Sequence, residues 1–240
     1  MNVIFLDIEV STSSGKIADL GAVDSLGRTI HTASQGEFLD FVKDAEYVGG
    51  HNVLNHDLQY LKHLELEKKK VVDTLYLSPL MFPMRPSHRL LKDEKILSDS
   101  LNNPLLDAQK SRDLFYDEVN AFHSLDNDLK DIYFNLLKGA REFKDFFEYV
   151  GLKEESKSFF NNLFSAKSHI KNVVAQIQKR FAGLICGNAS LESFVVEHPV
   201  ELAYALSVIH LQEKRSITPA WVLRNYPYTE NILFLLRRLC

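Results

Sequence analysis

The chain opens with a short apolar run that ends in two carboxylates. Residues 3–6 read Val-Ile-Phe-Leu, and Asp7 and Glu9 follow with one residue between them. Such a run of β-formers predicts a strand covered on both faces. Because side chains alternate along a strand, Asp7 and Glu9 should point to the same face. They would repel each other unless a cation lay between them, and Mg²⁺ or Mn²⁺ suits an oxygen-rich site. The alternative is a strand that runs out into a polar turn, because Asp-x-Glu alone is a weak motif.

The next segments alternate between strand and helix patterns. A turn at 24–27 separates two strand-like segments and predicts an antiparallel hairpin. The full order is strand, strand, strand, helix, strand, helix, strand, followed by a helix, which is typical of an α/β domain with a mixed sheet. After the opening strand, the predicted strands are 16–23, 28–33, 47–52 and 71–73, the last followed by the segment Thr74-Leu75-Tyr76-Leu77, and the predicted helices are 37–45 and a segment that begins near Asp57.

A third carboxylate, Asp57, lies at the predicted start of a helix. It follows Gly50-His51-Asn52, small and polar residues that would keep the approach to the strand end open. The alternative is an N-cap, in which the Asp57 side chain accepts a hydrogen bond from a backbone N–H.

A fourth carboxylate, Asp107, falls in the first turns of another predicted helix. Asn103-Pro104 marks the start of this helix, and an apolar stripe from Ala108 to Phe122 predicts that it packs on the sheet. Asp107 could then face the open strand ends. The alternative is an acidic residue that merely favours the helix dipole.

From Leu125 onward strand patterns vanish and helical periods dominate. Glycines and a proline separate the segments, as expected for helix ends. The repeated phenylalanines stand at helical spacing and predict a core, with a base-stacking surface as the alternative. The predicted helices are 128–138, 141–150, 154–164, 170–181, 191–197, 201–211 and 228–239.

Composition narrows the function classes. The 240 residues are 45% hydrophobic and 25% charged, which is ordinary for a soluble globular protein. The net charge of −4 gives no overall attraction to nucleic acid, so a phosphate partner would need a local basic patch or metal ions. Two cysteines fit a reducing compartment. With neither a secretion signal nor a long apolar segment, we expect a cytoplasmic protein and no membrane partner.

The four acidic positions, in this order and on these elements, resemble the DEDD superfamily of 3′–5′ exonucleases, also called DnaQ-like. The first motif is Phe5 to Glu9, the second runs from Gly50 to Leu58, and the third is the helix with Asp107 and Ala108. The segment Val72-Asp73-Thr74-Leu75 also resembles one that these enzymes carry between the second and third motifs. The combination is far more specific than any single piece.

The resemblance implies an RNase H-like fold, a mixed five-stranded sheet with flanking helices. It also implies two Mg²⁺ or Mn²⁺ ions that cleave the terminal phosphodiester. Asp7 would bridge the metals, Glu9 and Asp107 would complete one site, and Asp57 would act directly or through water. By the same resemblance, His51 and Asn52 would contact the substrate.

One position departs from the family pattern. Many members carry a histidine five residues before the last aspartate as general base, and here that residue is Asn102, which cannot take up a proton and is left as a substrate contact. His88 is a candidate replacement, with Arg89 beside it to hold phosphate. His88 and Asp93 also have the family spacing, so the third motif could lie there, although Asp107 fits better. A histidine with no catalytic part is an equal alternative for His88.

The second half carries a weaker resemblance. The segments 218–227 and 231–240 resemble the connector after such a nuclease domain in some bacterial fusions with a RecQ-like DNA helicase. This implies a nuclease-like domain at 1–122 and a helical domain or connector at 123–240, in an N-terminal piece of a longer polypeptide. The chain has no Gly-x-x-x-x-Gly-Lys-Ser/Thr loop, so it should not itself hydrolyse ATP.

The leading expectation is therefore a metal-dependent 3′–5′ exonuclease that acts on DNA 3′ ends, mainly single-stranded, in repair or recombination. One alternative is a nuclease-fold module that binds nucleic-acid ends or a partner without cutting. Another is an RNA exonuclease, because the chemistry does not itself select the sugar.

Overall fold

The computed structural model describes residues 1–90, 103–153, 162–186, 191–211 and 218–238. These residues form two compact units. The first contains 1–77 and 89–120, and the second contains 78–88 and 121–240. Two helices, α3 (Thr74–Met81) and α4 (Pro104–Ser124), contribute residues to both units. The predicted division at residue 122 stays a prediction.

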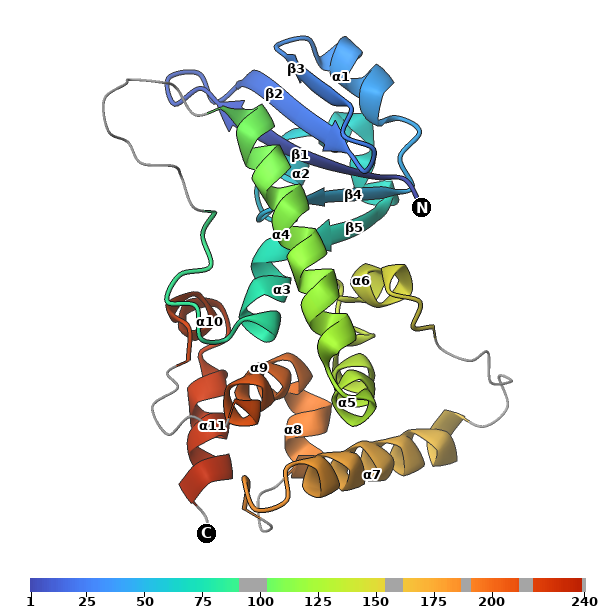
Figure 1. Cartoon of the computed structure of the whole chain (residues 1–240), viewed down its shortest axis with the longest axis vertical. Coiled ribbons are helices and arrows are strands. Elements are labelled where there is room, and N and C mark those ends of the chain that lie inside the picture. The colour runs from blue at the N-terminus through green and yellow to red at the C-terminus, as the bar shows by residue number, and fades with distance from the viewer. Residues whose placement is uncertain (91–102, 154–161, 187–190, 212–217, 239–240) are drawn as a thin grey trace. The chain divides into compact units, whose positions relative to one another are not determined.

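The first unit is built on one mixed sheet of five strands in the order β3-β2-β1-β4-β5. β1 is the central strand: it pairs antiparallel with β2 and parallel with β4 (Figure 1). With its flanking helices, this arrangement is consistent with an RNase H-like fold and confirms the expected α/β class. The elements are β1 (Val3–Val10), β2 (Ile17–Asp24), β3 (Thr29–Thr32), α1 (Gln35–Val42), β4 (Tyr47–Gly50), α2 (Asp57–Tyr60), two 3₁₀ turns (Lys62–Leu64 and Leu66–Lys68), β5 (Lys70–Asp73), α3 (Thr74–Met81) and α4 (Pro104–Ser124).

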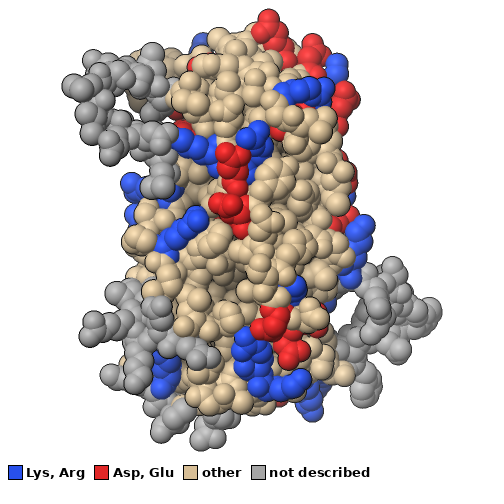
Figure 2. Space-filling model, viewed as in Figure 1, with Lys and Arg blue, Asp and Glu red and all other residues tan. Residues whose placement is uncertain are grey.

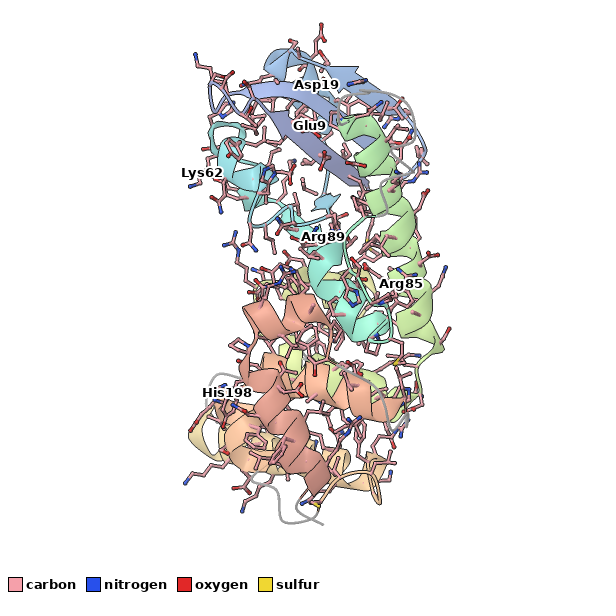
Figure 3. The ribbon with its side chains drawn as sticks, turned by 90° about the vertical axis from the view of Figure 1, so that its left-hand side faces the viewer. Glu9, Asp19, Lys62, Arg85, Arg89 and His198 are labelled. Atoms are coloured by element: carbon pink, nitrogen blue, oxygen red, sulfur yellow. The ribbon has the colours of Figure 1, made fainter. Side chains whose placement is uncertain are left out.

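The central strand is buried on both faces over its first half, as its apolar run predicts. Val3, Ile4, Phe5 and Leu6 are all buried. The Phe5 ring packs against Phe115 of α4, with ring centroids 5.3 Å apart. Odd-numbered residues of β1 therefore face α4, whereas α2 and the 3₁₀ turns cover the opposite face (Figures 1 and 3). Asp7 and Glu9 continue the odd-numbered row, so they belong to the α4 side.

The start of α4 is specified locally. The side chain of Asn103 accepts hydrogen bonds from the backbone N–H groups of Leu105 (3.1 Å) and Leu106 (3.2 Å). Pro104 occupies the first helical position, where a missing N–H costs nothing. This cap fixes Asp107 in the first turn, on the side of the helix adjoining the sheet.

The two glycines that end β4, Gly49 and Gly50, serve packing rather than an open approach. A Cβ on Gly49 would meet the ring of Phe5, and a Cβ on Gly50 would meet Val53 and the carbonyl oxygen of Leu6. Both positions are filled by neighbouring groups. The expectation that these small residues keep the strand end open is therefore wrong for the glycines themselves.

The second unit is helical, as the loss of strand patterns predicts. α9 is its central helix, because α5, α8 and α11 all pack against it and Leu202 to Ile209 are buried. The rings of Phe122, Phe146 and Phe147 pack edge to face, which supports a core over a stacking surface. Its remaining helices are α5 (Asn127–Leu137), α6 (Lys144–Tyr149), α7 (Asn162–Arg180), α8 (Leu191–Glu197), α9 (Pro199–His210), α10 (Ala220–Asn225) and α11 (Tyr228–Arg238).

β5 ends at Asp73, as the sequence predicts, and Thr74 begins helix α3. The Asp73 side chain accepts the backbone N–H of Leu75, which caps the new helix and stops the strand. The predicted helix after Asp57 is only four residues long and continues as 3₁₀ turns. The predicted helix 154–164 lies mostly outside the described residues.

None of the described helices combines the length and the apolar character that a membrane span requires. Cys186 is buried and disulfide-bonded. This differs from the expectation, drawn from the cysteine count, of thiols in a reducing compartment.

Candidate metal centre

Three of the four predicted carboxylates meet on the α4 side of the sheet. Asp7 and Glu9 come from β1, and Asp107 comes from the first turn of α4. One carboxylate oxygen of each lies within 4.8 Å of the others, and all three residues are half-buried. Residues about one hundred positions apart in the chain thus form one acidic cluster, which could bind a metal ion.

A glycine on β2 lets α4 approach closely enough to form this cluster. Gly21 lies directly opposite Asp7 in the antiparallel pair. A Cβ on Gly21 would overlap the backbone of Pro104 and Leu105, at the start of α4. The lack of a side chain at Gly21 therefore brings the first turn of α4, and Asp107 with it, beside Asp7.

Asp57 is held next to the cluster but is not a member of it. Its Oδ1 accepts a hydrogen bond from the backbone N–H of Ile8 at 3.0 Å, so it is anchored to the residue between Asp7 and Glu9. Burial raises the pKa of Asp57, against the opposing influence of His56 and the Ile8 N–H. The residue at the N-cap of α2 is His56, so Asp57 is not the helix cap that the sequence alone allows.

A second buried aspartate holds the loop that leads to Asp57. Asp73 accepts the backbone N–H groups of Asn52 (2.8 Å) and Leu54 (3.0 Å) in addition to that of Leu75 (3.0 Å). Asn52 has a φ of 68°, a left-handed conformation that asparagine tolerates better than most residues. The ring of His51 hydrogen-bonds to Thr74 at 2.8 Å. The predicted substrate contacts His51 and Asn52 are thus part of a fixed loop.

The predicted substitute base, His88, belongs to the second unit. It is only 4% exposed, and its Nδ1 hydrogen-bonds to Ser78 at 2.8 Å. Burial, with a contribution from Arg85, lowers the pKa of His88 to about 4. Arg89 belongs to the first unit and is exposed. Asn102 and Asp93 lie outside the described residues.

Residues that the sequence did not single out also adjoin the cluster. Asp19 lies opposite Glu9 on the neighbouring strand, and its carboxylate is 2.6 Å from His31 Nε2. Figure 3 shows Glu9 and Asp19 on the sheet, between α4 on one side and the segment with Lys62 on the other. On the opposite side of β1, His56 Nδ1 is 3.6 Å from Asp57 Oδ2. The alternation of side chains in the predicted hairpin could have identified Asp19 as a neighbour of Glu9. No local sequence pattern indicates that His31 or His56 lies near the site.

The cluster fits the demands of a hard divalent cation. Oxygens that share one Mg²⁺ or Mn²⁺ at about 2.1 Å lie up to about 4.2 Å apart, and one carboxylate oxygen from each residue of the cluster lies within 4.8 Å of the others. Half-buried carboxylates in such proximity repel each other, and a cation would offset that repulsion. On the face shown in Figure 2, acidic and basic side chains are mixed, without one dominant basic area among the coloured residues.

Comparisons with protein-family models, with curated proteins and with solved structures found no match to this chain. The structure itself therefore defines the class of protein. It has an RNase H-like sheet, and an acidic cluster forms where the central strand meets the first turn of α4.

Proposed function

We propose that the first unit is a metal-dependent 3′–5′ exonuclease that hydrolyses the terminal phosphodiester of single-stranded DNA. The observation that supports this most is the convergence of Asp7, Glu9 and Asp107 at β1 of an RNase H-like sheet. The resemblance to DEDD exonucleases supplies the expectation of two Mg²⁺ or Mn²⁺ ions.

Each residue would have a distinct part. Asp7 and Glu9 would hold cations from the rigid central strand, and Asp107 would close the site from α4. Asp57, anchored to the Ile8 N–H, would contribute through water. A divalent ion bound there would supply a Lewis acid that activates water and offsets charge on the scissile phosphate. His51, Asn52 and Arg89 stay proposed substrate contacts.

The test is degradation of single-stranded DNA labelled at its 5′ end, in the presence of Mn²⁺. We expect progressive shortening from the 3′ end. Asp7→Asn should lower the rate by about 100-fold or more, the scale expected when a group that stabilises transition-state charge is lost. Mn²⁺ binding, followed by calorimetry, should weaken in the same variant.

The matched control is Asp113→Asn, which removes an exposed carboxylate of the same helix that is paired with Arg112. It should leave both cleavage and Mn²⁺ binding unchanged. Full activity in Asp7→Asn would refute the assignment. A parallel RNA oligonucleotide of matched sequence separates DNA and RNA exonucleases.

The placement of His88 favours a second candidate, a nuclease-fold module that binds nucleic-acid ends without efficient cleavage. The ring is buried and its Nδ1 is engaged by Ser78, so it is poorly placed to accept a proton from water. Tight binding of DNA ends without product, at saturating Mn²⁺, would support this candidate. A fused helicase domain is also a proposal, and it rests on the resemblance of the last segments alone.

A further inference from the structure

Helix α7, in the second unit, is positively charged although the chain is acidic overall. Its 19 residues include no aspartate or glutamate, and they include Lys167, Lys171, Lys179 and Arg180. Helix α4, which has a similar length, carries four acidic and two basic residues. The whole chain has a net charge of −4, so the residues outside α7 together carry −8. α7 is therefore a concentrated positive segment of a negative protein.

The exposed face of α7 presents only basic and neutral side chains. The helix packs against α5 and α8, and Val173, Val174 and Ile177 form its buried side (Figure 1). At 3.6 residues per turn, its exposed polar residues fall within about 140° of the helix circumference. They are Lys167, Ser168, Lys171, Asn172, Gln178 and Lys179. Lysine, hydroxyl and amide side chains are the types that contact phosphate oxygens in nucleic-acid complexes.

The repulsion between Lys167 and Lys171 is not compensated within the helix. These exposed lysines lie four residues apart on the same side, and like charges at this spacing destabilise a helix. No acidic residue of α7 lies three or four positions from either of them. Among the described residues, neither lysine has an ion pair, whereas Lys179 is 3.5 Å from Asp128. The pair therefore gains nothing for the fold of α7, and an anionic partner would offset its repulsion.

We propose that this exposed face of α7 binds the phosphate backbone of a nucleic-acid strand without reading its sequence. The face offers positive charge and hydrogen-bond donors, and no described residue of α7 is an exposed large apolar side chain. A protein partner would need apolar or aromatic anchors. A membrane-surface helix would need a free apolar face, and that face of α7 is buried. The inference goes beyond the proposed function, because binding at α7 requires neither metal ions nor cleavage.

The test is the fluorescence anisotropy of a labelled single-stranded oligothymidylate titrated with the full chain in EDTA. Chelation removes the cations that the acidic cluster would hold, so the binding that remains belongs to other surfaces. Lys167→Gln combined with Lys171→Gln should weaken this binding about ten-fold or more at low salt. The slope of log K against log salt concentration should become shallower by about 1.4, because each phosphate contact on a single strand contributes about 0.7.

The matched control is Lys144→Gln combined with Lys153→Gln. It removes two positive charges from the second unit outside α7, and Lys153 there is 3.5 Å from Glu148. This control should bind the oligonucleotide as the wild type does. Lys167→Arg combined with Lys171→Arg keeps both charges and should also bind normally. Because the glutamine variant of α7 loses a repulsion, its unfolding temperature should not fall, so weaker binding reports the lost charges.

Several results would overturn the proposal. They are no binding of the oligonucleotide by the wild type in EDTA, an unchanged affinity and salt slope in the glutamine variant of α7, or an equal loss in the control. Phosphatidylglycerol vesicles are titrated in parallel. If Lys167 and Lys171 are needed for binding vesicles and not for binding DNA, the partner is a membrane and the proposal is wrong.

The same assay separates this proposal from the proposed nuclease activity. Asp7→Asn should bind the oligonucleotide in EDTA with wild-type affinity, since Asp7 belongs to the first unit. If no DNA is cleaved in Mn²⁺ but binding still depends on Lys167 and Lys171, the proposed function fails and the α7 surface stands.

Discussion

Asp73 shows how one buried carboxylate can hold a loop in place. Its Oδ1 accepts the N–H groups of Asn52 and Leu75, and its Oδ2 accepts that of Leu54. Burial nevertheless raises the pKa of Asp73 to about 7, well above its usual value of 3.8. Because Asp73 holds the backbone of the loop that leads to Asp57, the stability of this loop should depend on the protonation state of Asp73.

The sign of this linkage gives a testable prediction. Between the unfolded pKa of 3.8 and the folded pKa of about 7, the folded state binds more protons at Asp73 than the unfolded state does. The free energy of unfolding should therefore fall, by up to a few kcal/mol, as pH rises through this window. In Asp73→Asn, the decrease in unfolding free energy that comes from this carboxyl should disappear. The amide oxygen of the variant can still accept two of the three N–H groups. Urea unfolding across the window measures it, and an unchanged pH slope in the variant would contradict the assignment. Because burial also raises the pKa of Asp57, the prediction concerns the difference between variant and wild type.

At the level of elements, the acidic cluster depends on how α4 docks on β2. Phe115 anchors the helix against Phe5, and Asn103 fixes where it begins. Gly21 then permits the first turn to lie directly on the sheet. Together, these three features of α4 packing place Asp107 beside Asp7.

Gly21→Ala should therefore disturb the metal centre without touching a carboxylate. The added methyl would overlap the backbone at Leu105, and overpacking of this kind costs about 1–3 kcal/mol. We expect lower stability together with weaker Mn²⁺ binding, measured by thermal unfolding and calorimetry. Gly36→Ala is the control, because the Cβ would have only Ser34 Oγ within 4 Å, at 3.9 Å, and α1 should be stabilised by about 0.5–1 kcal/mol. Wild-type Mn²⁺ affinity in a folded Gly21→Ala protein would show that the close approach is not required.

At the scale of the whole molecule, the chain divides into two units, and only the first contains the acidic cluster. Ligands that bind the folded state protect the region that must stay folded to bind them. Mn²⁺ should therefore slow amide hydrogen exchange in β1 and at the start of α4, whereas α9 should exchange as before. Hydrogen-exchange mass spectrometry of the full chain measures both at once, with Asp7→Asn as the variant that should lose the effect. Equal protection of α9 would indicate that the two units open together.

The sequence determined the local features of this protein, because they depend on neighbouring residues. Alternation along β1 was enough to predict that Asp7 and Glu9 share a face, and Asn103-Pro104 was enough to start α4. The order of strands and helices likewise predicted an α/β unit followed by helices.

Only the tertiary structure decided how the distant parts meet. Three features join residues that lie at least ten positions apart. They are the close approach of Gly21 to the start of α4, the hydrogen bond from the Ile8 N–H to Asp57, and the contact of the buried His88 with Ser78. Such contacts depend on sheet order and helix docking, and neither leaves a periodic pattern in the chain. For the same physical reason, the sequence leaves the convergence of Asp107 with the opening carboxylates a hypothesis, and only the fold brings one carboxylate oxygen of each within 4.8 Å of the others.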